Sequence, residues 1–95
     1  MKQSTLKFKM YTKENCSYCN MSKIMLMENN IDFEEVDIED NAQALAFLRL
    51  QNFRTVPQIY DGDQHVGGYT ELVKYLKNEK VHTRKPTQNK SKQKT

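Results

Sequence analysis

The chain has 95 residues, of which 37% are hydrophobic, and its formal net charge is +3. This length allows one domain with a modest core and not two. No apolar run approaches the roughly 20 residues that a membrane-spanning helix needs. The first residues also lack an apolar signal-peptide stretch, so we expect a cytoplasmic protein without a membrane partner.

The positive charge is concentrated at the C-terminal end. Residues 79–95 contain six Lys or Arg and one acidic residue, whereas residues 1–78 contain nine basic and eleven acidic residues. The basic isoelectric point therefore belongs to the end of the chain, and we expect no nucleic-acid binding by the domain. Because Val81 is the one sizeable apolar residue after position 79, we expect a domain at 1–78 and a disordered tail at 79–95.

Strands are predicted from alternating polar and apolar residues, and helices from composition and capping residues. Asn41 is the expected cap of the second helix. The expected elements are a strand at 7–11, a helix at 16–30, a strand at 33–38, a helix at 41–50, a strand at 56–60, a strand at 64–66 and a helix at 70–77. The Asp-Gly-Asp segment at 61–63 is the expected hairpin turn between the last two strands.

The order β-α-β-α-β-β-α predicts an α/β fold. The first two strands, joined by a helix, form a parallel βαβ unit, and the last two form an antiparallel hairpin. The prediction is a four-stranded mixed sheet flanked by three helices.

The only two cysteines, Cys16 and Cys19, stand where a strand gives way to a helix. A secreted disulfide scaffold would contain more cysteines, and a zinc site would need two further ligands, which the distant His65 and His82 do not readily supply. Free N–H groups and the helix dipole favour a thiolate at a helix start, and Lys13 adds positive charge. We therefore expect a lowered pKa for Cys16 as nucleophile and a more buried, resolving Cys19. The alternative is a pair of structural thiols in a core helix.

Pro57 stands at the start of the third predicted strand. Proline has no N–H, so a neighbouring backbone edge stays unpaired in the sheet. If the Val56–Pro57 bond is cis, the N–H and C=O of Val56 can pair with a peptide-like ligand as an added strand does. Taken alone, an ordinary proline at the start of an edge strand is the better explanation.

Gly67 and Gly68 join the last strand to the last helix. Glycine allows positive φ or a close approach, and the first N–H groups of the helix, near Tyr69 and Thr70, form an anion site suited to a carboxylate. Taken alone, a plain turn with Thr70 as N-cap explains this segment at least as well.

Together the three segments resemble the glutaredoxins, a family with the thioredoxin fold, over about residues 5–78. The family pattern is a Cys-Pro-Tyr-Cys site with a basic residue three positions before it, then Thr-Val-Pro, then Gly-Gly followed by a helix. The corresponding segments here are Lys13-Glu14-Asn15-Cys16-Ser17-Tyr18-Cys19, Thr55-Val56-Pro57-Gln58-Ile59-Tyr60 and His65-Val66-Gly67-Gly68-Tyr69-Thr70-Glu71. The resemblance implies a glutathione-dependent reductase of protein disulfides and glutathionyl mixed disulfides, with no tightly bound cofactor.

The resemblance also implies where glutathione binds. In the family, the basic residue before the first cysteine meets the glycine carboxylate, and the Thr-Val-Pro backbone pairs with the glutathione cysteine. The residues after Gly-Gly receive the γ-glutamyl carboxylate. Carried over to this chain, the implied contacts are Lys13, Tyr18, Arg54, Thr55, Val56, Pro57, Gly68, Tyr69 and Thr70.

One departure from the family pattern is Ser17, which replaces the usual proline. Some glutaredoxins with a Cys-Ser-Tyr-Cys site look able to hold a [2Fe-2S] cluster between two monomers through the first cysteine and bound glutathione. A cluster-binding dimer, with Cys16 as the metal ligand, is therefore our second hypothesis for a chain that we otherwise expect to be a monomer.

Three further alternatives concern partners. Thioredoxin itself fits less well, because the chain has no Trp. A redoxin served by thioredoxin reductase is a closer rival, against which the Gly-Gly-Tyr-Thr segment argues. An adaptor that docks through the basic tail is the third. Ribonucleotide reductase is a common client of the family, but no residue here identifies it as the substrate.

Overall fold

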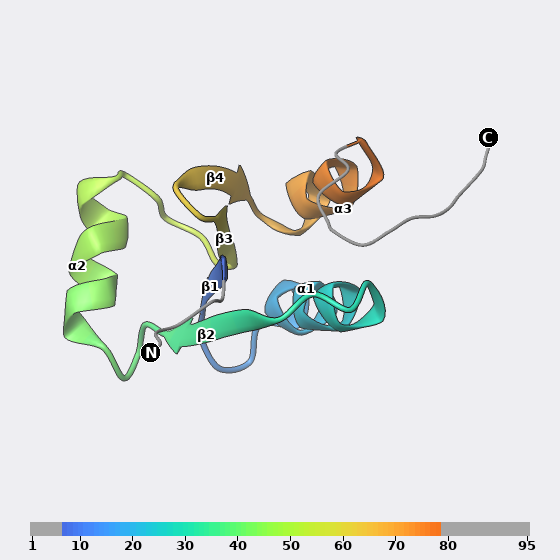
Figure 1. Ribbon diagram of the computed structural model, residues 1–95. Helices are drawn as coiled ribbons and strands as arrows, with labels where there is room; N and C mark the ends of the chain where they lie inside the picture. Colours follow the sequence, from blue (N-terminus) through green and yellow to red (C-terminus); the bar gives the residue numbers. More distant parts are fainter. Residues whose placement is uncertain (1–6, 79–95) are drawn as a thin grey trace, which may run out of the picture.

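The computed structural model describes residues 7–78. Its elements are β1 (Phe8–Thr12), α1 (Ser17–Glu28), β2 (Phe33–Asp37), α2 (Ala42–Leu50), β3 (Gln58–Asp61), β4 (Gln64–Gly67) and α3 (Tyr69–Asn78) (Figure 1). The predicted order of elements is confirmed. No helix within the described part of the chain is long and apolar enough to cross a bilayer. The expected tail at 79–95 lies outside the described residues.

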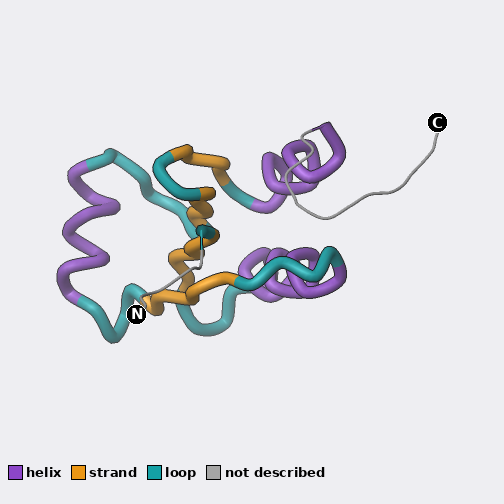
Figure 2. The backbone as a smooth tube through the Cα atoms, viewed as in Figure 1, coloured by secondary structure: helices purple, strands orange, loops and turns teal. Residues whose placement is uncertain are grey.

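The four strands form one mixed sheet in the order β2-β1-β3-β4, which confirms the predicted α/β architecture (Figure 2). β1 pairs in parallel with β2 and antiparallel with β3, and β3 pairs antiparallel with β4. Gly62, with φ +64°, makes the hairpin turn between β3 and β4. Because β1 is a central strand, its C-terminal end and the loop that follows it lie in the middle of one end of the sheet.

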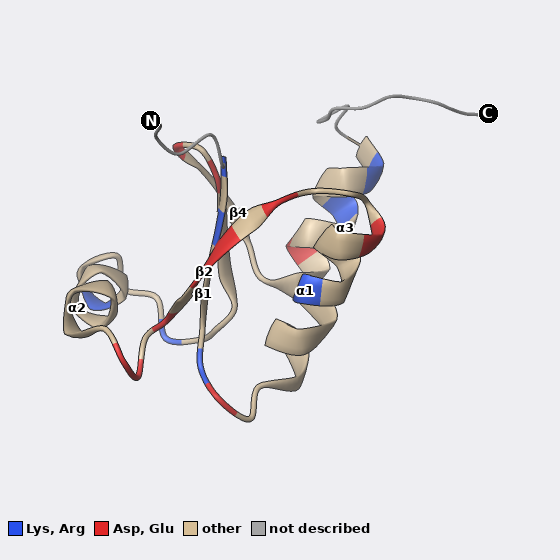
Figure 3. Ribbon diagram, turned by 60° about the horizontal axis from the view of Figure 1, so that its bottom comes forward, with Lys and Arg blue, Asp and Glu red and all other residues tan. Residues whose placement is uncertain are grey.

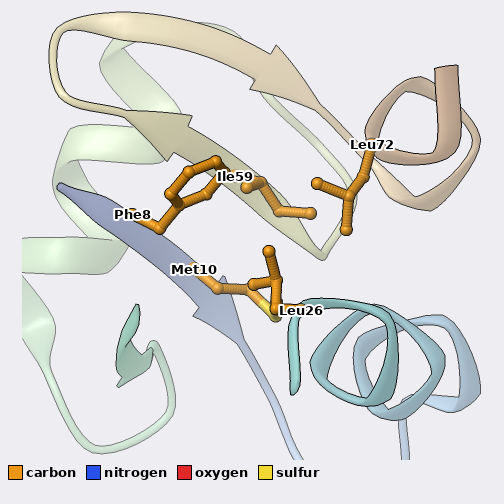
Figure 4. Close-up of a cluster of buried hydrophobic side chains, with 5 residues drawn as sticks. All are labelled: Phe8, Met10, Leu26, Ile59 and Leu72. Carbon is orange, nitrogen blue, oxygen red and sulfur yellow. The ribbon is translucent and has the colours of Figure 1, made fainter. Parts of the chain in front are cut away.

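One face of the sheet is covered by α1 and α3. Phe8 and Met10 from β1 meet Ile59 from β3, Leu26 from α1 and Leu72 from α3 in one buried cluster (Figure 4). Full burial of such a side chain contributes about 1.5–3 kcal/mol. This cluster fixes α1, which begins at the cysteine pair, and α3, which begins directly after the Gly-Gly segment.

The other face of the sheet is covered by α2. Tyr11, whose side chain points opposite to that of Met10, is buried with Ala44 and Leu48 of α2. The side chain of Asn41 caps this helix by accepting a hydrogen bond from the Ala44 N–H at 2.9 Å, as predicted. The helix therefore has a fixed start and packs its apolar side on the sheet.

Both α1 and α2 end on an asparagine in the left-handed region, Asn30 with φ 58° and Asn52 with φ 64°. At the end of α1, the Ile31 N–H bonds to the Leu26 carbonyl and the Asn30 N–H bonds to the Met27 carbonyl. This arrangement is a Schellman motif, which satisfies carbonyl groups that the helix leaves unpaired.

The edge strand β2 is rich in acidic side chains (Figure 3). Glu35 accepts hydrogen bonds from the Thr12 hydroxyl at 2.8 Å and from Lys23 Nζ at 3.0 Å. Burial raises the pKa of the Glu35 carboxyl, but the hydrogen bonds from Thr12 and Lys23 and the charge of Lys23 outweigh it and lower the pKa. The contact ties the end of β1 to α1, on both sides of the loop that leads to the cysteine pair.

Candidate active site

Cys16 is the N-cap residue of α1, and its φ and ψ of −119° and 103° are extended. Its Sγ accepts a hydrogen bond from the Cys19 N–H at 3.1 Å. Asn15, directly before it, has φ 57°, and this turn brings the chain from the loop into the helix. Helix α1 therefore starts at Ser17, one residue after the start predicted from the sequence.

Cys16 and Cys19 form a disulfide and differ in exposure. Cys16 is partly exposed, whereas only 1% of Cys19 is accessible. The first turn of α1 contains no acidic residue. Once the disulfide is reduced, the backbone N–H groups and the positive end of the helix dipole therefore favour a Cys16 thiolate, and no carboxylate in the first turn opposes them.

A groove of about 760 Å³ opens beside Cys16, between the loop after β1, the C-terminal half of α2 and the loop before β3. Within the described residues, its cations Lys13, Arg49 and Arg54 form no ion pair. The lining residues are Lys13, Asn15, Cys16, Ser17, Tyr18, Ile38, Leu45, Leu48, Arg49, Asn52, Phe53, Arg54, Thr55 and Val56. The groove is therefore positively charged and suited to an anionic ligand.

The loop before β3 approaches the cysteine pair. Cys16 Sγ lies 3.7 Å from the carbonyl oxygen of Val56, and the Val56–Pro57 peptide bond is cis. The predicted strand at 56–60 starts too early, since β3 begins at Gln58. Because Pro57 has no N–H to donate, the hydrogen-bond ladder begins only after it, and Val56 lies before the strand. Within residues 7–78 the Val56 N–H has no hydrogen-bond partner.

The Gly-Gly segment differs from its predicted arrangement. Helix α3 begins at Tyr69, and the Gly68 N–H donates to Glu71 Oε1 at 2.9 Å. Glu71 therefore closes the helix start, as the acidic residue of a capping box does, and Thr70 is not the N-cap. Gly67 has φ +121°, and a Cβ there would lie 2.8 Å from the Glu71 side chain.

The structure brings some of the predicted contact residues together and separates others. Lys13, Tyr18, Arg54, Thr55 and Val56 line the groove. Pro57, Gly68, Tyr69 and Thr70 do not line it. The rings of Tyr18 and Tyr69, 5.9 Å apart, connect the groove to the start of α3.

Sequence reasoning missed the wall of the groove that α2 and the residues directly after it supply. Arg49 and Asn52 belong to it, together with Leu45 and Phe53. Arg49 stands in the last turn of a helix, where a basic residue is expected for the helix dipole alone. Only the packing of α2 on the sheet brings this residue into the same groove as Cys16.

The fold and this site define a class: a domain of thioredoxin-like architecture with a redox-active cysteine pair at a helix N-terminus. Comparison with known proteins narrows it. A family model described as Glutaredoxin matches residues 8–66. Glutaredoxin 3 of Escherichia coli is 38% identical over 63 residues, which cover 65% of this chain and 76% of that protein. The chain belongs to the glutaredoxin family, and it is a thiol–disulfide oxidoreductase.

Solved structures agree with this assignment. The crystal structure of glutaredoxin 1 from Francisella tularensis complexed with cacodylate has a TM-score of 0.65 and 40% identity, and the match covers 74% of this chain and 91% of that one. The glutaredoxin-like protein NrdH-redoxin from Escherichia coli has a TM-score of 0.69 at 24% identity, and the match covers 82% of this chain and 97% of that one. At 24% identity, the similarity to NrdH-redoxin shows only a common fold.

Proposed function

We propose that the protein is a glutathione-disulfide oxidoreductase, with Cys16 as nucleophile and Cys19 as resolving thiol. The observation that carries this proposal is the position of Cys16 Sγ. It caps a helix N-terminus, lies 3.7 Å from the Val56 carbonyl, and stands in a groove whose cations have no ion pair among residues 7–78. Such a position favours a thiolate and an anionic, peptide-like disulfide beside it.

Reduction of a glutathionylated substrate needs Cys16 alone. The Cys16 thiolate attacks the glutathione sulfur, the mixed disulfide bond breaks, and the substrate leaves as a thiolate that takes a proton. A second glutathione thiolate then attacks the glutathione sulfur bound to Cys16. Oxidised glutathione leaves and the Cys16 thiolate is restored.

Reduction of a protein disulfide uses both cysteines. Cys16 attacks one sulfur of the client and forms a mixed disulfide, and the other client sulfur leaves as a thiol. Cys19 then attacks Cys16, which releases the reduced client and forms the Cys16–Cys19 disulfide. Two glutathione molecules return this disulfide to the dithiol and leave as oxidised glutathione.

Glutathione binding in this proposal uses the backbone groups of Val56, whose N–H has no partner among residues 7–78, and the charge of the groove. The Val56 N–H and C=O pair with the cysteine residue of glutathione as an added strand does. Lys13 and Arg54 attract the glycine carboxylate. Because Glu71 already accepts from Gly68, the N–H groups of Tyr69 and Thr70 remain for the γ-glutamyl carboxylate.

The cluster hypothesis requires more than one chain. A [2Fe-2S] cluster is held by four ligands, usually thiolates. Residues 7–78 contain no group of three or more His, Cys, Asp or Glu side chains that could hold a metal ion. The described residues of one chain therefore do not fit a cluster. The hypothesis, in which two chains and two glutathiones supply the ligands, stays a prediction, and no step of the proposed reaction depends on it.

A coupled assay tests the proposed function. Glutathione, glutathione reductase and NADPH are mixed with a glutathionylated peptide, and NADPH consumption is followed. We expect Cys16→Ser to abolish turnover, and Cys19→Ser to retain it while losing most reduction of a protein disulfide. Turnover supported by thioredoxin reductase but not by glutathione would contradict the proposal and favour the redoxin alternative.

A further inference from the structure

A buried amide lies directly behind the loop that approaches Cys16. Gln58, the first residue of β3, is only 7% exposed, and both ends of its amide are hydrogen-bonded. Its Nε2 donates to the Thr55 carbonyl at 3.0 Å and lies 3.3 Å from the Thr55 hydroxyl. Its Oε1 lies 2.7 Å from Nε2 of His65 on β4. One side chain thus connects the far edge of the sheet to the loop.

The direction of these bonds follows from the donors and acceptors available. The Thr55 carbonyl can only accept, so the NH₂ group of Gln58 must face it, and Oε1 must face His65. Nε2 of His65 is therefore the donor in this contact and Oε1 of Gln58 the acceptor. The His65 ring is stacked on Phe53 with centroids 4.4 Å apart, which holds it in place.

Apart from the Gln58 amide, the loop is held mainly by the packing of Val56 against the cluster of Tyr11, Ala44 and Leu48. Arg54 and Thr55 are exposed, Val56 is only partly buried, and the Val56 N–H has no hydrogen-bond partner within the described residues. Val56 lies next to Thr55 in sequence and 3.7 Å from Cys16 Sγ through its carbonyl oxygen. The Gln58 amide therefore fixes the Thr55–Val56 peptide group, which contains the Val56 N–H and directly precedes the Val56 carbonyl.

We propose that Gln58, oriented by His65, is a positioning residue that holds the Thr55–Val56 backbone ready to pair with glutathione. It thereby sets the preference of the enzyme for glutathione over thiols that have no peptide backbone. This inference rests on the proposed function. A purely structural role would predict a different result, because loss of stability or a shift of the whole sheet would affect every thiol alike.

The test compares two reductants of the Cys16–Cys19 disulfide. Rate constants are measured with glutathione and with 2-mercaptoethanol at equal thiolate concentration, by alkylation and mass spectrometry of the free thiols. In each case a thiolate attacks Cys16 Sγ, Cys19 leaves as the thiolate, and a second thiol releases Cys16. Only glutathione has the backbone groups that Val56 can pair with.

The variants are Gln58→Met, which keeps most of the volume and removes the amide, and His65→Phe, which keeps the stacked ring and removes the donor. For Gln58→Met we expect about a tenfold lower rate constant with glutathione, which equals about 1.4 kcal/mol. The rate constant with 2-mercaptoethanol should change less than about twofold. For His65→Phe we expect about a threefold loss with glutathione alone. The matched control, Gln64→Met, makes the same replacement at an exposed site on β4 and should match the wild type.

The outcomes separate this inference from the proposed function. A wild-type preference for glutathione that survives in Gln58→Met and His65→Phe overturns the inference alone. Equal losses with both thiols overturn it in favour of a structural role. A wild type without any preference for glutathione overturns the proposed function and this inference with it. If Gln58→Met does not fold, as judged by its thermal melt, the exposed His65→Phe variant decides the question.

Discussion

The charge of the groove gives a prediction whose magnitude follows from the structure. Lys13 is exposed, lines the groove beside Cys16 and forms no ion pair within residues 7–78. A carboxylate about 4 Å from such a cation gains about 1 kcal/mol in water. Because about 1.4 kcal/mol is a factor of ten, Lys13→Ala should raise the KM for glutathione about fivefold at low salt.

Ionic strength provides the second half of this test. The Debye length falls from about 8 Å at physiological ionic strength to about 3 Å at 1 M salt, so the KM ratio of variant to wild type should approach one in high salt. The assay is the glutathione-coupled reduction of a glutathionylated peptide over a series of salt concentrations. Lys74→Ala, which removes an exposed lysine of α3 outside the groove, is the control. A KM for Lys13→Ala that equals the wild-type value at low salt, or a rise that Lys74→Ala reproduces, would refute the reasoning.

Three further predictions concern the fold that holds the site. Leu72→Ala removes a fully buried side chain and should lower the free energy of unfolding by about 2–5 kcal/mol in a urea titration; a loss below about 1 kcal/mol would mean that the cluster repacks. Asn30→Ala should cost about 1 kcal/mol in the same measurement because of its positive φ, whereas Asn30→Gly should not destabilise. The lowered pKa of Glu35 implies a stabilisation that is complete above the ordinary carboxyl pKa and lost as the pH falls through the folded-state value. The difference in melting temperature between wild type and Glu35→Gln should therefore be small at neutral pH, because the Glu35 side chain is 38% exposed, and should disappear in acid. A difference that does not depend on pH would contradict this.

Much of the fold could be predicted because each element has a strong local signal. In β1 the alternation of Phe8 and Met10 with Lys9 and Tyr11 fixes which side chains face which helix. The end of β3 and the hairpin follow from Gly62, whose positive φ the turn requires. Local signals of this kind do not depend on partners far away in the chain, so the predictions made from them agree with the folded structure.

The errors occur where a side chain from elsewhere decides the local structure. Thr70 has the right chemistry for an N-cap, but the Glu71 carboxylate reaches back to Gly68, so the helix starts one residue earlier. Gly68 and Glu71 have the three-residue spacing of a capping box with glycine at the N-cap, so the sequence itself contains the signal for this helix start. Gln58 carried no such signal, because a glutamine in an alternating strand is expected to face solvent, and only the pairing of β3 with β4 buries it against His65.

The different exposure of the two cysteines supports the division of roles that their positions at the helix start predict. Both lie at the start of α1 with Cα atoms 5.2 Å apart, yet only Cys16 is partly exposed. Thiol–disulfide exchange needs direct access of the attacking sulfur to its target. In the proposed reaction, an incoming client disulfide therefore reaches Cys16 first, and Cys19, with 1% of its surface accessible, attacks only the Cys16 sulfur of the mixed disulfide, so that the client leaves. In this proposal, the burial that keeps Cys19 from attacking a client first leaves the neighbouring Cys16 sulfur as its one accessible target.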